Sequence, residues 1–148
     1  MEPWRIIDAY FCRVCDTPDE QLNPESVSLV RVWHSFGSIE NGGFHGYLCE
    51  VGDEALELAK HYRSIGIETG ALLIEQGAGL WRRYWHEDSP DNSNPDDFRR
   101  LFHSELNEIE SNFYGLEDSV IAALLPIAQR NTKFSSPARA GTLEEPEI

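Results

Sequence analysis

Residues 39–47 read Ile39-Glu40-Asn41-Gly42-Gly43-Phe44-His45-Gly46-Tyr47. The residue types in this stretch suit a particular backbone conformation rather than the apolar face of a helix. Two adjacent glycines adopt positive φ at no steric cost, and asparagine is the next most tolerant residue. Phe44 and Tyr47 are three residues apart, so a helix that begins near Gly43 would place both rings on one side. The stretch predicts a tight turn between two helices with aromatic anchors; a backbone loop that contacts a ligand is the alternative.

The rest of the chain carries helical periodicity, with apolar residues at steps of three and four. Trp4, Ile7, Phe11 and Val14 predict a first helix over residues 2–15. Further helices are expected over residues 24–37, 43–51, 53–65 and 69–86, from residue 95 to Gly115, and after Gly115. We therefore expect one compact all-α domain of about seven helices over residues 1–134, followed by a loosely held C-terminal tail over residues 135–148.

Helix boundaries are marked by capping residues, prolines and glycines. Asn23-Pro24-Glu25 and Asn94-Pro95-Asp96 each give a cap, a proline at the first helical position and an early acid. Gly37, Gly52, Gly66 and Gly115 are predicted helix ends, and Asp53 is predicted to cap the helix that follows it.

The charge balance is strongly acidic for a chain of 148 residues. Against 26 acids there are 12 bases, which gives a net charge of −14. Such a surface repels nucleic-acid phosphates and anionic membranes and attracts basic proteins. We therefore expect a basic protein partner, and no binding to nucleic acid or membrane; plain solubility is the alternative explanation of the charge.

The N-terminal apolar run is interrupted by Arg5 and Asp8, and no window approaches the roughly 20 apolar residues of a membrane span. Three cysteines, an odd number, do not make a disulfide framework. These features favour a cytoplasmic location.

No pattern of catalytic or metal-binding residues is evident. The five histidines contain no i, i+4 pair, and phosphate-binding glycine loops and nucleophile elbows are missing. We expect no cofactor, no metal site and no catalytic residue. A polar cleft that gathered several of His34, Glu40, His45 and Cys49 would instead favour an enzyme.

Acidic residues concentrate between His86 and Asp118, where ten acids face two bases. Asp97, Glu105 and Glu108 fall on one flank of their predicted helix, so they could form an outward row that imitates the phosphates of DNA. We expect this surface to carry no interleaved Lys or Arg; a solvated acidic face is the alternative. A second acidic segment, free of bases, surrounds the glycine pair (Glu40, Glu50, Asp53, Glu54, Glu57). The predicted partner-binding residues are Glu87, Asp88, Asp91, Asp96, Asp97, Glu105 and Glu108.

The motif residues Glu40, Asn41, Gly42, Gly43, Phe44 and Tyr47 resemble the signature of a bacterial family named for a DNA-mimic protein. Gly46 and Glu50 stand where the family pattern has glutamine and asparagine. The resemblance covers about residues 22–134, through Leu106, Ile109, Phe113, Tyr114, Ile127, Asn131 and Phe134. It implies a helical fold. Because turns of the Asn-Gly type are common, we expect the motif loop to be structural.

Charge and resemblance together favour a non-enzymatic interaction protein that occupies the basic surface of a DNA-binding regulator or nuclease, as a DNA mimic. An immunity or antitoxin-type inhibitor of a basic toxin is the first alternative. A hydrolase-like enzyme with its site near the Asn-Gly-Gly-Phe loop is the second. A homodimer is left open.

Overall fold

The computed structural model describes the backbone of residues 1–83 and 95–147 and the side chains of residues 1–83 and 100–132. The helices are α1 (Pro3–Val14), α2 (Pro24–Val51), α3 (Ala55–Ser64), α4 (Glu68–Trp81), α5 (Pro95–Tyr114) and α6 (Glu117–Glu147), with 3-10 turns η1 (Asp19–Gln21) and η2 (Gly52–Glu54). The described backbone contains no strand, which confirms the all-α prediction. The helices are fewer than the seven predicted, because residues 24–51 form one element instead of two.

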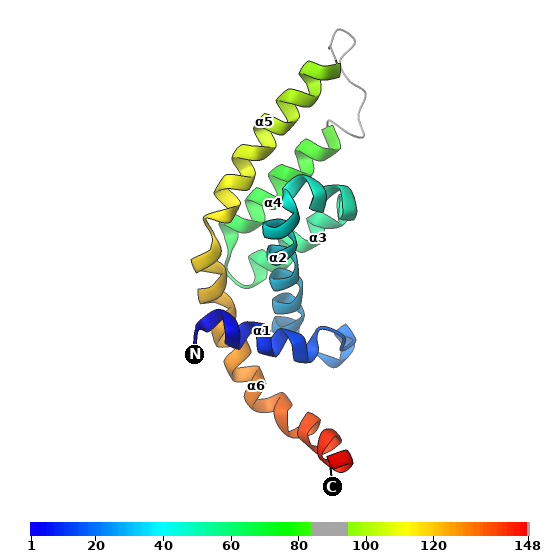
Figure 1. Cartoon of the computed structure of the whole chain (residues 1–148), viewed down its shortest axis with the longest axis vertical. Coiled ribbons are helices and arrows are strands. Elements are labelled where there is room, and N and C mark those ends of the chain that lie inside the picture. The colour runs from blue at the N-terminus through cyan, green and yellow to red at the C-terminus, as the bar shows by residue number, and fades with distance from the viewer. Residues whose placement is uncertain (84–94, 148) are drawn as a thin grey trace.

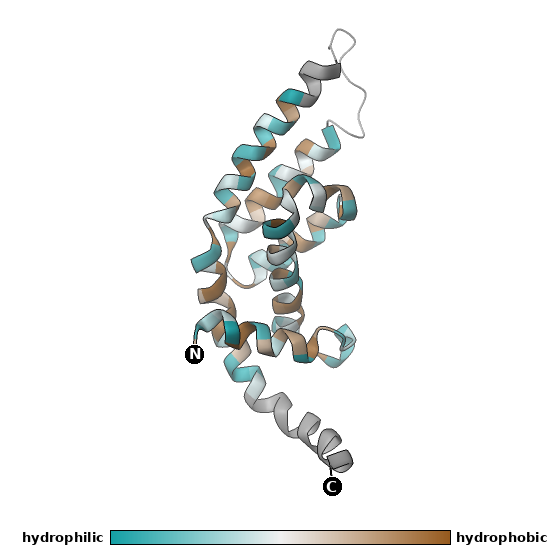
Figure 2. Ribbon diagram, in the orientation of Figure 1, coloured by the Kyte–Doolittle hydropathy of each residue, from teal (hydrophilic) through white to brown (hydrophobic). Residues whose placement is uncertain are grey.

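The helices pack around α2 and α4. In Figure 1, α3 lies on α4, α5 runs along α4, and α1 crosses α6 and the first part of α2. Their ribbons carry apolar and polar residues in alternation, as amphipathic helices do (Figure 2). Within the described residues, no helix is both long and apolar enough to cross a membrane. α6 extends to Glu147; the boundary at residue 134 stays a prediction.

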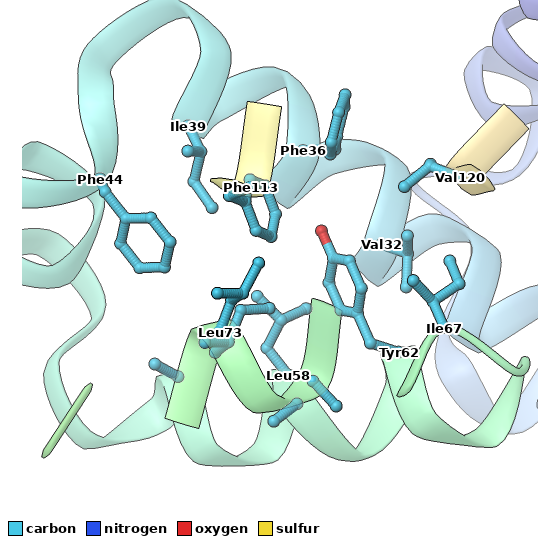
Figure 3. Close-up of a cluster of buried hydrophobic side chains, with 14 of the residues drawn as sticks. Val32, Phe36, Ile39, Phe44, Leu58, Tyr62, Ile67, Leu73, Phe113 and Val120 are labelled. Carbon is cyan, nitrogen blue, oxygen red and sulfur yellow. The ribbon is translucent and has the colours of Figure 1, made fainter. Parts of the chain in front are cut away.

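The hydrophobic core is organised around Phe113 of α5. Its ring centroid lies 5.3 Å from that of Phe36, 5.4 Å from that of Phe44 and 5.9 Å from that of Tyr62. Figure 3 shows these rings converging from α2, α3 and α5. Phe44 also presses on α4, since a Cβ at Gly77 would lie 2.8 Å from its ring. Gly77 therefore permits the close approach of α2 to α4.

Three predicted boundaries agree with the structure. Asn23 caps α2, where its side chain accepts from the Ser26 amide over 2.9 Å. α2 ends at Val51, before Gly52, and α5 ends at Tyr114, before Gly115. The Asn23 amide also donates to Asn131 Oδ1 over 2.6 Å, which ties the start of α2 to α6.

Three local predictions were wrong. α2 continues through Gly37, because one helical glycine costs only about 1 kcal/mol while Phe36 and Ile39 gain burial on either side of it. Asp53 caps no helix; it lies inside η2, and α3 begins at Ala55. In α1 the buried face uses Tyr10, whose hydroxyl bonds Ser26 Oγ at 2.8 Å, whereas Trp4 is 40% exposed.

Candidate partner-binding surface

The glycine motif lies at a break within α2. Gly43 has φ 84° and ψ 159°, so one glycine of the pair adopts the predicted positive φ, while Gly42 does not. Phe44 follows directly and is fully buried, as predicted. The expected turn between two helices is thus a single-residue interruption of one helical element.

Two side chains of α5 bond to the backbone at this break. The Phe44 amide donates to Glu110 Oε2 over 2.5 Å, and the Tyr114 hydroxyl donates to the Ile39 carbonyl over 3.1 Å. An interrupted helix leaves amides and carbonyls without intrahelical partners, and a carboxylate is favourable where a helical segment restarts. Glu110 and Tyr114 therefore act as the partners of the interrupted backbone.

Glu40, Glu110 and Glu117 converge beside the break from three different helices. Burial, and then the charge of Glu117 together with a hydrogen bond to it, raise the pKa of Glu40. Burial, and then the charges of Glu110 and Glu40, raise the pKa of the Tyr114 hydroxyl. In the sequence these carboxylates lie in two separate segments, one around the glycine pair and one between His86 and Asp118. One feature of the sequence could have indicated the two α5 side chains at the break. Glu110 and Tyr114 are four residues apart and border the apolar stripe of α5.

Glu105 and Glu108 lie along an open groove between α4 and α5. The groove has a volume of about 530 Å³, and Leu80 and Ile109 contribute apolar surface to it. Arg83 lies within 3.9 Å of Glu105, measured from Nη2 to Oε2. The expectation of an acidic surface without interleaved bases is therefore wrong at Glu105, because the residues that follow α4 place Arg83 alongside α5.

The other predicted partner-binding residues are less fully described. Asp96 and Asp97 belong to the first turn of α5, but their side chains lie outside the described residues. Glu87, Asp88 and Asp91 lie wholly outside them. A role in partner binding stays a prediction for all seven residues.

The second acidic segment acquires bases from its surroundings. Arg82 Nη2 lies 3.1 Å from Asp53 Oδ1, and Lys60 Nζ lies 2.8 Å from Glu57 Oε1. The hydrogen bond from Lys60 lowers the pKa of Glu57. The acidic segment contains no bases in the sequence, but the fold places basic side chains beside it that partly neutralise its charge.

The residues that would favour an enzyme are divided between different places. His34 lines a cavity between α1, α2 and α3, to which His45, Glu40 and Cys49 do not contribute. His45 lies against Phe102 and His103, and burial, then His103, lowers its pKa. Its Nε2 is 3.6 Å from Cys49 Sγ on the exposed side of α2. Across the described side chains, no group of three or more His, Cys, Asp or Glu residues could hold a metal ion.

Most of this chain is similar to a known protein family. A family model described as DMP19-like protein matches residues 20–131. This range contains the break in α2, the two α5 side chains that bond to it, and the groove between α4 and α5. The searches of curated proteins and of solved structures each found no match.

Proposed function

Because this chain belongs to the DMP19-like protein family, a family of DNA mimics, we propose that it is a non-enzymatic protein that occupies the DNA-binding surface of a basic partner. The family match is the observation that carries the proposal. The partner would be a DNA-binding regulator or a nuclease. A net charge of −14 supports it, since this charge accelerates association with a basic surface and disfavours association with nucleic acid.

The acidic flank of α5, defined by Asp97, Glu105 and Glu108, is the surface that we assign to the partner. The helix advances about 16 Å between Asp97 and Glu108. One DNA strand presents about five charges over that length, at one per ~3.4 Å. Three carboxylates on α5 fall short of this density. The imitation of a phosphate row would therefore require further carboxylates beside these three, and Glu87, Asp88 and Asp91 are the predicted source.

The groove beside the flank suits a long basic side chain. Leu80 and Ile109 would cover the aliphatic stem of an arginine or lysine, while Glu105 and Glu108 would receive its charged group. The contact of Arg83 with Glu105, at 3.9 Å, is long enough to be exchanged for a closer partner. Between partly exposed side chains, it contributes little to stability.

An exposed leucine gives the inhibitor alternative a specific basis. Leu101 is 51% exposed. Because residues four positions apart lie on the same face of a helix, Leu101 lies between Asp97 and Glu105 on the same flank of α5. In an inhibitor of this type, shape and a few buried anchors would carry more of the binding energy than a row of charges. Salt separates the two functions, because a charge-row mimic loses affinity steeply with ionic strength and an anchored inhibitor only modestly.

The test begins with affinity capture from the native cell at low and moderate salt, followed by identification of the bound protein. The acidic flank is then neutralised with Asp97→Asn, Glu105→Gln and Glu108→Gln. A matched control, Asp16→Asn, Glu20→Gln and Glu50→Gln, removes the same three charges from exposed positions elsewhere. We expect the flank variant to lose about 1 kcal/mol or more of binding free energy per close ion pair, and the control much less.

Competition with DNA completes the test. The captured protein should bind either its own DNA or this chain, and the affinity should fall steeply between about 50 and 200 mM salt. Equal affinity of the flank variant and the parent at low salt would remove this surface from the proposal. Simultaneous binding of DNA and this chain would exclude mimicry.

A further inference from the structure

A cavity of about 440 Å³ lies between α1, α2 and α3, and no residue of α5 lines it. Its wall includes Val30 from before the break in α2 and Tyr47 from after it. In a straight helix these residues would be about 25 Å apart along the axis. The break at Gly43 is therefore what allows both to face one cavity, whose volume is typical of small-molecule sites.

The hydrogen bonds around His61 assign its proton. Ser64 Oγ donates to the His61 carbonyl over 2.9 Å, so its single proton is used. Ser28 Oγ, 3.1 Å from Ser64 Oγ, must then donate to Ser64, and it accepts from His61 Nδ1 over 2.9 Å. Burial, and then the charge of Arg31, lower the pKa of His61, so the ring is neutral near pH 7. Its Nε2, which bonds no described residue, is left as a hydrogen-bond acceptor, and the ring lines both this cavity and the neighbouring one that Lys60 and Ser64 also line.

Two further oxygen groups face the same cavity. Neither Tyr47 nor Glu54, both on the wall, is hydrogen-bonded or ion-paired to a described residue. Burial, then the charges of Glu50 and Glu54, raise the pKa of Tyr47 to about 12, so its hydroxyl stays neutral. Glu57 also lines the cavity but is paired with Lys60.

The remaining wall is largely apolar. Val30 and Leu58 are buried, and Phe11 stacks on His34 with ring centroids 6.4 Å apart. Arg31 is the cation on the wall, and it donates to Asp19, which balances its charge at the rim. The cavity thus combines an apolar body with acceptors and one unpaired carboxylate.

We propose that this cavity binds a small organic ammonium ion with an apolar, preferably aromatic, body. The ammonium group would donate to Glu54 and Tyr47, and the body would lie against Phe11, Val30 and Leu58. The negative field of the chain concentrates such cations at its surface. This inference goes beyond the proposed function, since it concerns a different face and a different class of ligand.

The test compares ligands of one shape and different charge by calorimetric titration of the full chain. Phenethylamine supplies ring and ammonium, 2-phenylethanol supplies the ring with a neutral group, and 3-phenylpropionate supplies the ring with a carboxylate. We expect phenethylamine to bind at least about tenfold more tightly than either other probe. Amide shifts in NMR spectra should be largest at Val30, Tyr47, Leu58 and His61.

Paired variants locate the ammonium group. Glu54→Gln should weaken phenethylamine binding about tenfold or more. Glu20→Gln, the control, removes a charge from an exposed position that does not line the cavity, and it should change affinity less than about twofold. Equal weakening by both variants would mean attraction by the general field and would overturn the proposal. Equal affinity for phenethylamine and 2-phenylethanol, or tighter binding of the carboxylate, would also overturn it.

Discussion

Glu110 accepts a hydrogen bond from the amide of Phe44, over 2.5 Å and across 66 residues of sequence. The bond joins α5 to the one point where α2 is interrupted. It converts a local irregularity of the backbone into a contact between helices. The interruption, the burial of Phe44 and the position of α5 are therefore expected to respond together to mutation.

Removal of the Glu110 carboxylate should expose this dependence. Glu110→Ala leaves the Phe44 amide without its acceptor, and we expect a loss of about 1–3 kcal/mol in the free energy of unfolding. Glu110→Gln keeps an acceptor oxygen and should lose less. Urea denaturation measures both, with the exposed Glu108→Ala as a control expected within about 0.5 kcal/mol of the parent. An unchanged midpoint for Glu110→Ala would show that water replaces the carboxylate at no cost.

The two glycines of the motif should respond in opposite directions to alanine. Gly43→Ala places a Cβ on a residue with φ 84° and within 3.3 Å of Glu110 Oε2, so we expect destabilisation of about 1–2 kcal/mol. Gly42 is helical with nothing within 4 Å of an added Cβ, so Gly42→Ala should stabilise by about 0.5–1 kcal/mol. Thermal denaturation of both variants checks the pair. Stabilisation by both would contradict the break at Gly43.

A second pair of glycines tests the packing of α4. Gly77→Ala directs a methyl group to within 2.8 Å of the buried Phe44 ring, and we expect a loss of about 1–3 kcal/mol from overpacking. Gly79→Ala meets nothing within 4 Å and should gain up to about 1 kcal/mol from helix propensity. Chemical denaturation of both variants separates the two effects. If Gly77→Ala matched Gly79→Ala, Phe44 would have to move freely within the core.

Stability should rise with mild acid. The pKa of Glu40 is raised in the folded state, so the folded chain holds this proton more tightly than the unfolded chain. Stability from this group therefore increases as pH falls through its folded pKa and levels off below the ordinary value for glutamate. We expect a higher Tm near about pH 5.5–6 than at pH 8 in low salt.

Lower pH should then reverse the trend. Hydrogen bonds from Arg130 and Arg63 lower the pKa values of Glu25 and Glu75, so the stability that these groups contribute is lost as pH falls below the ordinary glutamate value. Glu40→Gln should reduce the gain in mild acid, while Glu20→Gln should leave it unchanged. A Tm that fell steadily from pH 8 downward would show that paired carboxylates dominate throughout.

Local signals predicted much of the fold. Asn23-Pro24-Glu25 starts α2, and Gly52 and Gly115 stand just after helix ends, because caps and stops depend on neighbouring residues. Gly37 misled the prediction, since burial of the residues around it outweighs its weak helix propensity. The glycine pair predicted the positive φ without saying which glycine would adopt it.

The candidate site was harder to predict from the sequence than the fold. The acidic flank follows from helical periodicity, yet the Arg83 beside Glu105 and the Arg82 beside Asp53 come from the residues that follow α4. Such pairs depend on how helices are rotated against one another. Periodicity in a single segment does not contain that information. For the same reason the cavity wall, assembled from both halves of α2, was not predicted.

The hydrogen bond between Asn23 and Asn131 joins residues 108 positions apart, near the two ends of the range matched by the family model. Asn131 also donates to Glu25 Oε2 over 2.6 Å, so the start of α2 is held at two points by α6. A contact of this span forms after the local helical contacts, because closing so long a loop costs conformational entropy. During synthesis on the ribosome, the first turn of α2 therefore cannot form these hydrogen bonds until Asn131 has been synthesised.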